Sequence, residues 1–460
     1  MRGMLYKKPI ADLQSDLESD HHLKRCLTAF DLTLLGIGAV IGAGIFILTG
    51  VAAATQSGPA IVLSFVLAGI ACAFSALSYA ELATTIGGCG SAYGYAYVGF
   101  GEIFAWIIGW DLILEYGLSC AAVAIGWSAY FAKFVTIFDW TVPKTFLNSF
   151  LASGIVDVPA LAIMMFITVL LTLGVKNGAR VNAVMVLVKF ITITVFVAVS
   201  APYINFHYWD NFMPFGWKGV MGGAAMIFFS YIGFDAVSTA AEEAIQPKRD
   251  LPIGIIASLA ICTAIYVVVS GVLTLVVSYN TLDTASPVAD VLLRLGHASA
   301  ASLISVGALA GLTTVILVMF YGMSRIMYAM SRDRLLPKFF LHLSSRFRTP
   351  TRILWASGIV IALIAATLPI GDVAELVNIG TLAAFSIANL GVIVLRYTQP
   401  DLPRPFKTPF GITLPFLGIV FCLYLMLSLS WITWVRFFVW MLIGLGFYLY
   451  HLHRKDRLKG

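Results

Sequence analysis

The segment Gly36–Gly44 reads Gly-Ile-Gly-Ala-Val-Ile-Gly-Ala-Gly and lies inside an apolar run from Leu32 to Leu48. Each glycine in a helix interior costs roughly 1 kcal/mol relative to alanine. Backbone released from a helix at membrane depth is tolerated only where it faces protein or a wet cavity. The pattern therefore predicts a broken membrane helix whose free amides and carbonyls bind a ligand. Close packing through Gly38-Ala-Val-Ile-Gly42 is an alternative that the segment leaves open.

The composition is that of a polytopic helical membrane protein. Hydrophobic residues make up 60% of the chain and charged residues 11%, whereas globular proteins have about 25% charged residues. Apolar runs of about 20 residues recur along the chain, as membrane-spanning helices require. We expect twelve spans, at roughly 31–56, 58–86, 93–132, 157–174, 180–200, 219–241, 252–278, 300–330, 352–370, 373–396, 411–430 and 433–451.

The positive charges predict how the chain is oriented. With both termini inside, the inner side holds 23 of the 29 lysines and arginines and the outer side holds five, as the positive-inside rule requires. We therefore expect a cell-membrane protein of bacterial type with cytoplasmic tails at 1–30 and 452–460. The first 25 residues do not resemble a signal peptide, and the net charge of +6 is not a nucleic-acid signal.

A second interruption is predicted within Gly219–Glu243, where small and polar residues meet inside an apolar helix. It lies in span six, five spans after the first. Because five is an odd number, the two broken helices enter the membrane from opposite sides, as in an inverted repeat. We expect a transport core over 31–396, with spans one to five and six to ten as its two halves. Spans eleven and twelve, at 397–451, form an appendage.

Three motifs carry a resemblance to a known family. Gly38–Phe46 and Gly233–Ile255 resemble the amino acid–polyamine–organocation superfamily, and Gly109–Tyr116 resembles its cationic amino acid transporter branch. The resemblance covers nearly the whole chain and implies a leucine-transporter-like fold. Animal members of the branch have fourteen spans, whereas this chain has twelve, like its bacterial relatives.

An amino-acid substrate needs partners for a carboxylate and an ammonium group, and helix ends supply both. In span one, we expect the amides of Ala43, Gly44 and Ile45 to bind the carboxylate and the carbonyls of Val40 and Ile41 to bind the ammonium group. The remaining candidates are the span-six carbonyls of Phe228, Phe229 and Ile232, the Phe229 ring as a gate, and Met319 at the side-chain end. A methionine there fills space and favours small neutral substrates over cationic ones.

Three buried charges are candidates for proton coupling or gating. Lys189 is the only charged residue in Asn182–Ala201, and such a residue usually marks function. The resemblance implies that its ammonium contacts span one where sodium-coupled relatives bind their ion. Asp235 is expected near the outer half of span six. Its alternative roles are to recognise a cationic substrate, to take a proton during gating, or to cap unwound backbone. Glu115 pairs with Lys189, sets charge selectivity or forms a structural ion pair.

These features predict a proton-coupled symporter of L-amino acids, cationic or small and neutral, that works by alternating access. An exchanger, a facilitator or a membrane amino-acid receptor is the alternative. The sequence has no nucleophile–base pair and no cofactor motif, so we do not expect an enzyme. Its six cysteines are scattered, so we expect no metal site.

Where span six ends, Glu242–Asp250 forms either a salt-bridged inner gate or a solvated turn. Besides substrate and protons, we expect only lipids as partners; the sequence does not address an accessory subunit.

Overall fold

A computed structural model describes residues 6–9, 27–87, 91–137, 143–147, 154–173, 178–241, 243–284, 286–344, 347 and 349–457. Within these ranges the chain is helical, apart from loops and one isolated backbone bridge between Leu27 and Ala244. Glu242 and most of both predicted tails lie outside the described residues.

The long helices follow the predicted spans closely. They are α4 (Ile61–Thr85), α6 (Glu102–Ile137), α7 (Val158–Thr172), α8 (Gly178–Ser200), α9 (Gly216–Ile227), α11 (Pro247–Val276), α13 (Ala298–Arg332), α14 (Thr351–Thr367), α15 (Ile370–Thr398), α16 (Thr413–Leu427) and α17 (Trp431–Arg457). Shorter helices are α2 (Ala29–Val40), α3 (Thr49–Ala52), α5 (Ser91–Gly99), α10 (Ala236–Thr239) and α12 (Pro287–Arg294).

One predicted span is divided in the structure. We expected a single helix over 93–132, but α5 ends at Gly99 and α6 begins at Glu102. Gly101 between them has φ of +109°, a conformation that glycine adopts without the steric cost of a Cβ atom. The chain therefore turns at this glycine, and the membrane helix begins about nine residues later than expected.

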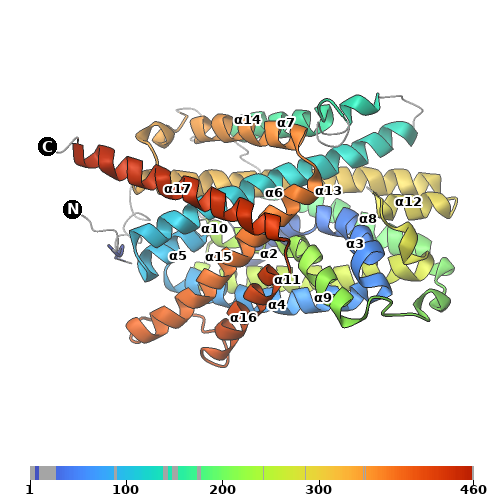
Figure 1. The fold of residues 1–460 in the computed structure, drawn as a ribbon, viewed down its shortest axis with the longest axis horizontal. Coiled ribbons are helices and arrows are strands. Elements are labelled where there is room, and N and C mark those ends of the chain that lie inside the picture. Colours follow the sequence, from blue (N-terminus) through green and yellow to red (C-terminus); the bar gives the residue numbers. More distant parts are fainter. Residues whose placement is uncertain are drawn as a thin grey trace.

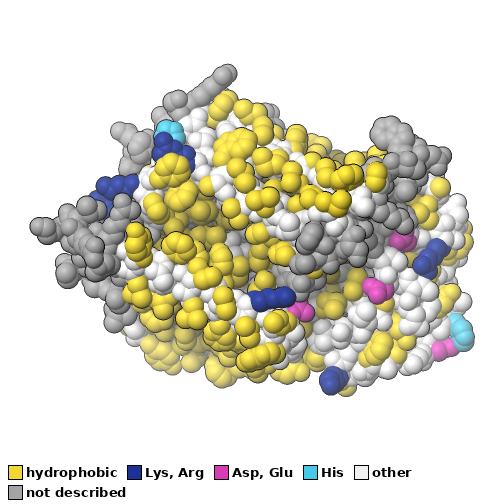
Figure 2. Space-filling model, turned by 45° about the horizontal axis from the view of Figure 1, so that its top comes forward, with side chains coloured by type: hydrophobic (Ala, Val, Ile, Leu, Met, Phe, Trp, Pro, Cys, Tyr) yellow, Lys and Arg dark blue, Asp and Glu magenta, His cyan; other side chains and the backbone are white. Residues whose placement is uncertain are grey.

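Eight helical segments among the described residues are long and apolar enough to cross a membrane, and four more are apolar but shorter. Hydrophobic side chains cover most of the face shown in Figure 2. Exposed leucine, isoleucine, valine and phenylalanine side chains are numerous on α8, α14, α16 and α17. Surfaces of this kind suit a multi-pass membrane protein, because they meet lipid rather than water.

The helices are packed around a long central pair, α6 and α13, which lie side by side (Figure 1). The other large interfaces join α4 to α11, α2 to α11, and α15 to α6 and α16. In Figure 1, α17 runs across the outside of the bundle. Its Trp440 stacks on Trp110 of α6, with 4.7 Å between the ring centroids.

Candidate substrate-binding site

The first broken helix begins with a capped end and stops where the glycines predict. Thr28 and Asp31 form a capping box at the start of α2, which satisfies amides that have no helical partner. The helix ends at Val40, and Ile41 is extended, with ψ of 102°. A π-helical turn, η1 (Gly44–Leu48), then resumes the span. The carbonyl end of one helix and the amide end of another therefore meet around Gly42.

The second break lies directly against the first. The helix α9 gives way to a 3-10 turn, η8 (Phe228–Tyr231), before α10 begins at Ala236. Gly233 has φ of +115°, and a Cβ atom there would lie 2.9 Å from Cβ of Ala39. Gly233 thus permits both the turn and the close approach of the two broken spans.

The glycines of the first break serve close packing, which is the alternative that the sequence left open. A Cβ atom on Gly38 would overlap the Asn182 side chain, and one on Gly44 would overlap both the backbone and the side chain of Ser230. One on Gly42 would lie 2.7 Å from Cγ2 of Val315. The broken span is therefore seated tightly against α8, η8 and α13.

A tyrosine hydroxyl joins the two breaks. The hydroxyl of Tyr266, on α11, lies 2.8 Å from the carbonyl oxygen of Val40 and 2.7 Å from that of Ser230. Because a hydroxyl has a single proton, it donates to only one of these carbonyls at a time. On the other side of the first break, Tyr130 of α6 donates to the carbonyl of Phe46 at 2.6 Å.

Lys189 contacts the first break as the family resemblance implies. Its Nζ donates to the carbonyl oxygens of Gly38 and Ile41, both at 2.7 Å, and the side chain is completely buried. These carbonyls belong to the last turn of α2 and to the residue after it, where the helix dipole favours a cation. The ammonium group thus lies at the carbonyl end of the broken helix.

A small cavity lies between the breaks and the central helix pair. Its volume is about 10 Å³, which admits about one water molecule, so neighbouring side chains must move to admit an amino acid. Six predicted site residues line it: Val40, Ala43, Gly44, Phe229, Ile232 and Met319. Five lining residues were not predicted: Ala39, Gly42, Ser119, Val123 and Val315.

Three predicted site residues do not line the cavity. The ring of Phe228 packs against Phe385, with 6.0 Å between the centroids. Ile45 is buried in the hydrophobic core, and the carbonyl of Ile41 accepts a hydrogen bond from Lys189. Helical spacing could have identified some of the missed residues, because residues four positions apart lie on one face of a helix. Val315 lies four residues before the predicted Met319, and Ser119 lies four residues before Val123.

The cavity lining is almost entirely apolar. Ser119 is its one side chain with a hydroxyl, is only 2% exposed, and has no hydrogen-bond partner among the described residues. None of the lining residues carries a charge. The helix ends are therefore the only polar groups beside Ser119 that border this cavity, and the rest of its wall is formed by side chains such as valine, isoleucine and methionine.

The acidic residues lie away from Lys189. Asp235 accepts a hydrogen bond from Tyr116 at 2.5 Å and another from the amide of Gly233 at 3.3 Å, as expected if it caps unwound backbone. Glu115 is buried and has no hydrogen-bond partner within the described ranges. The structure therefore does not form the Glu115–Lys189 pair considered from the sequence.

The position expected for Asp235, near the outer half of span six, does not agree with the cytoplasmic N-terminus expected from the positive charges. We placed it near the outer half of span six, but it follows the break and lies close to α10, which leads to the Leu27–Ala244 bridge. It is therefore in the half of the span nearer to the N-terminal segment, because the span runs toward that segment after the break.

The segment after span six is partly salt-bridged, through Glu243, and partly solvated, since Lys248 and Arg249 are exposed. Glu243 accepts hydrogen bonds from Arg325 at 2.5 Å and from Tyr321 at 2.6 Å, both on α13. On the same side, Lys8 pairs with Asp333 at 2.8 Å. These contacts join the end of the second broken span and the N-terminal segment to α13.

Comparison with known proteins identifies the family. A family model described as amino acid permease matches residues 27–448. The branched-chain amino acid permease BcaP of Bacillus subtilis (strain 168) is 47% identical over 100% of both chains, and the methylthioribose transporter of that organism is 45% identical over 98% of both. Cationic amino acid transporter 4 of Homo sapiens is 34% identical over 86% of this chain and 64% of its own length. This multi-pass membrane protein therefore belongs to the amino acid permease family of the amino acid–polyamine–organocation superfamily.

Proposed function

We propose that the protein is a proton-coupled symporter of neutral L-amino acids, small or branched, that works by alternating access. The observation that carries the proposal is the meeting of two broken helices around an apolar cavity, with Lys189 hydrogen-bonded to the carbonyls of the first break. In membrane transporters, the amide ends of broken helices bind anionic substrate groups and their free carbonyls bind cationic groups, so together they suit a zwitterion.

The substrate class follows from the lining of the cavity. The amide end of η1 at Gly44 faces the carboxylate, and the carbonyl ends of α2 and η8 face the ammonium group. Val123, Val315 and Met319 surround the side chain. A guanidinium or an ammonium group in this region would be buried without a counter-ion, which is costly. Neutral aliphatic side chains therefore fit, and the name of one relative, branched-chain amino acid permease, agrees with this.

The proposed protein has twelve membrane spans, an inverted repeat of five spans and cytoplasmic termini. The eight long and four shorter apolar segments support twelve spans, when Gly44–Thr85 is divided near Gly58 and its first part is joined to α2 as one broken span. Breaks in spans one and six support two inverted halves of five spans. Both termini are cytoplasmic in this proposal, and the N-terminal segment and the end of α17 contact the start of α6 on one side, through Tyr6 and Tyr448.

The experiment is uptake of labelled leucine, alanine and arginine into proteoliposomes, with an inward proton gradient, without a gradient, and with a protonophore. Accumulation of leucine and alanine above equilibrium, abolished by the protonophore, is the expected result. Uptake that only reaches equilibrium indicates a facilitator, and uptake that requires internal substrate indicates an exchanger. Methylthioribose is included as a competitor because one relative carries that name.

A further inference from the structure

A groove on the lipid-facing surface lies outside the cavity described above. It runs between α4 and α11, has a volume of about 460 Å³ and is lined almost entirely by apolar side chains. Small residues form much of its floor, and the rims expose Val66, Ile70 and Ala260. Since the surrounding solvent is lipid, the groove is filled by a hydrocarbon chain or by another protein.

One face of α11 continues from this groove to a charged end. Arg249, Ile253, Ile256, Ala260 and Ala264 follow each other at three- and four-residue intervals, so they lie on one side of the helix. Ile256, Ala260 and Ala264 line the groove, and Ile253 is 41% exposed. At 1.5 Å per residue, Arg249 is roughly 10 Å along the helix axis from the nearer end of the groove.

The cations at this end are available for a ligand. Lys248 and Arg249 are both exposed, and neither forms an ion pair with any residue in the described parts of the chain. The neighbouring Asp250 is buried and accepts a hydrogen bond from the amide of Gln246. Glu243 is already paired with Arg325.

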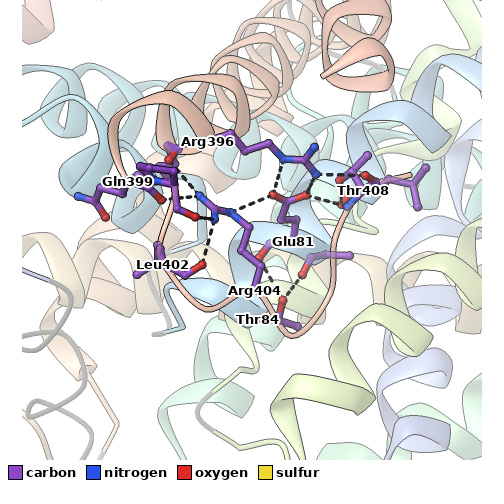
Figure 3. A network of polar contacts seen from close by, with 11 residues as sticks. Glu81, Thr84, Arg396, Gln399, Leu402, Arg404 and Thr408 are labelled. Carbon is purple, nitrogen blue, oxygen red and sulfur yellow. Dashed lines mark hydrogen bonds and ion pairs between the residues drawn. The ribbon is translucent and has the colours of Figure 1, made fainter. Parts of the chain in front are cut away.

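The adjacent end of α4 adds no free negative charge. Its Glu81 accepts two hydrogen bonds from Arg396, at 2.9 and 2.5 Å, and lies 3.6 Å from Arg404 (Figure 3). The amide of Thr408 donates to the same carboxylate at 2.7 Å. One carboxylate thus faces two guanidinium groups, and this end of the helix pair has an excess of positive charge.

We propose that the groove binds an acyl chain of an anionic glycerophospholipid whose phosphate contacts Arg249 and Lys248. The groove extends about 12 Å along α11, from Ile256 to Ala264, which is within the roughly 15 Å depth of one leaflet. Exposed lysines and arginines at this depth attract anionic headgroups. In the proposed orientation this is the cytoplasmic leaflet.

The bound chain packs directly behind the broken spans. The groove residues Gly69 and Thr263 lie close together, and a Cβ atom on Gly69 would lie 2.9 Å from Cγ2 of Thr263 and 3.0 Å from the Tyr231 hydroxyl. That hydroxyl donates to the carbonyl of Phe65 at 2.7 Å. Filling the groove therefore supports the helix pair that holds η8 in place.

The test is native mass spectrometry of the full-length protein in detergent, with phosphatidylglycerol or phosphatidylcholine of identical chains added. Wild type should retain phosphatidylglycerol preferentially, in a one-to-one complex with the monomer. Arg249→Gln should reduce its retention about fivefold, the effect of one cation near an anionic headgroup. Ala260→Trp and Ala264→Phe, each filling the groove, should reduce it at least as much.

Two matched variants control for charge and bulk. Lys218→Gln removes an exposed cation at the opposite end of the fold, and Ile261→Trp adds bulk to a lipid-exposed position of α11 outside the groove. Both should bind like wild type. Equal retention of the two lipids by wild type overturns the proposal, as does unchanged retention in Arg249→Gln and both groove-filling variants. A dimer without lipid assigns the groove to a second copy and also overturns it. Because this experiment measures lipid binding without transport, failure of the lipid-binding proposal can be distinguished from failure of the transport proposal.

Discussion

At the scale of single residues, the proposed site separates recognition of the substrate's charged groups from recognition of its side chain. In this proposal the helix ends bind the charged groups of the amino acid, while Ser119, Val123, Val315 and Met319 form the remaining wall of the cavity. We expect a change at one wall position to alter which substrate side chain is accepted and to leave the helix ends in place.

Met319→Ser should weaken leucine relative to arginine. The variant loses a buried thioether contact and gains a hydroxyl that hydrogen-bonds a guanidinium group. Removing apolar contact from a pocket costs roughly 1–3 kcal/mol, so the leucine concentration for half-maximal competition should rise about tenfold. The measurement is competition of leucine, alanine and arginine against labelled alanine. An unchanged order of the three competitors would place Met319 away from the substrate side chain.

Ser119→Ala should improve binding of aliphatic substrates. The hydroxyl has no protein partner in the described structure, so the one water that the cavity admits can satisfy it when no substrate is bound. An aliphatic substrate displaces that water and leaves the hydroxyl unsatisfied, which costs about 1–3 kcal/mol. The half-saturating leucine concentration should fall about fivefold. Ser78→Ala, which removes another buried unpartnered hydroxyl away from the cavity, is the matched control. Equal kinetics in both variants would remove Ser119 from the site.

At the scale of elements, the two breaks are held by packing and by hydrogen bonds from α6, α8 and α11. The sequence predicted both breaks, because clustered glycine and polar residues weaken a helix inside an apolar span. It did not predict the π-helical turn. It also did not predict the hydrogen bond from Tyr266 to Val40, because these two residues are 226 positions apart in the chain. It also placed the start of α6 too early, because the Gly101 turn lies within a continuous apolar pattern.

Gly44→Ala should destabilise the protein, because the added Cβ atom overlaps Ser230 backbone as well as its side chain. For this reason, a bulkier residue at Gly44 cannot test substrate binding without disturbing the fold. Gly94→Ala is the control, since no atom lies within 4 Å of a Cβ atom placed there, and in α5 alanine is favoured by about 1 kcal/mol. Thermal unfolding in detergent should show a lower midpoint only for Gly44→Ala. Equal midpoints would contradict the tight seating of the first break.

Tyr266→Phe should weaken the link between the breaks. It removes the hydroxyl shared by the carbonyls of Val40 and Ser230, and leaving a buried polar group unsatisfied costs about 1–3 kcal/mol. Tyr79→Phe is the matched control, because the Tyr79 hydroxyl is buried without a partner in the described chain. We expect a lower unfolding midpoint and slower uptake in the first variant alone. Similar losses in both variants would show that the Tyr266 hydroxyl does not join the breaks.

At the scale of the whole molecule, the small volume of the cavity and the ion pairs on the side of the N-terminal segment are features of a single conformation. Glu243 with Arg325, and Lys8 with Asp333, fasten the second broken span and the N-terminal segment to α13. Opening toward this side requires these contacts to separate. A group whose charge state changes the hold on the first broken span can bias that opening, and Lys189 is placed to do so.

The energy needed for such a bias is small. Shifting a balanced equilibrium tenfold takes about 1.4 kcal/mol, which is within the range of one hydrogen bond from a charged group. Protonated Lys189 donates to Gly38 and Ile41 and holds α2. A deprotonated amine binds these carbonyls more weakly, so in the proposed mechanism release of the proton favours opening.

The most direct test is concentrative uptake of leucine by wild type and Lys189→Ala at several external pH values, with exchange of internal for external substrate measured in parallel. We predict that acid outside increases accumulation by wild type, and that the variant loses this accumulation at least tenfold while retaining some exchange. Accumulation by the variant with the wild-type pH dependence would contradict the account. Lys189 would then be structural, and Asp235 or Glu115 would become the proton-coupling candidate.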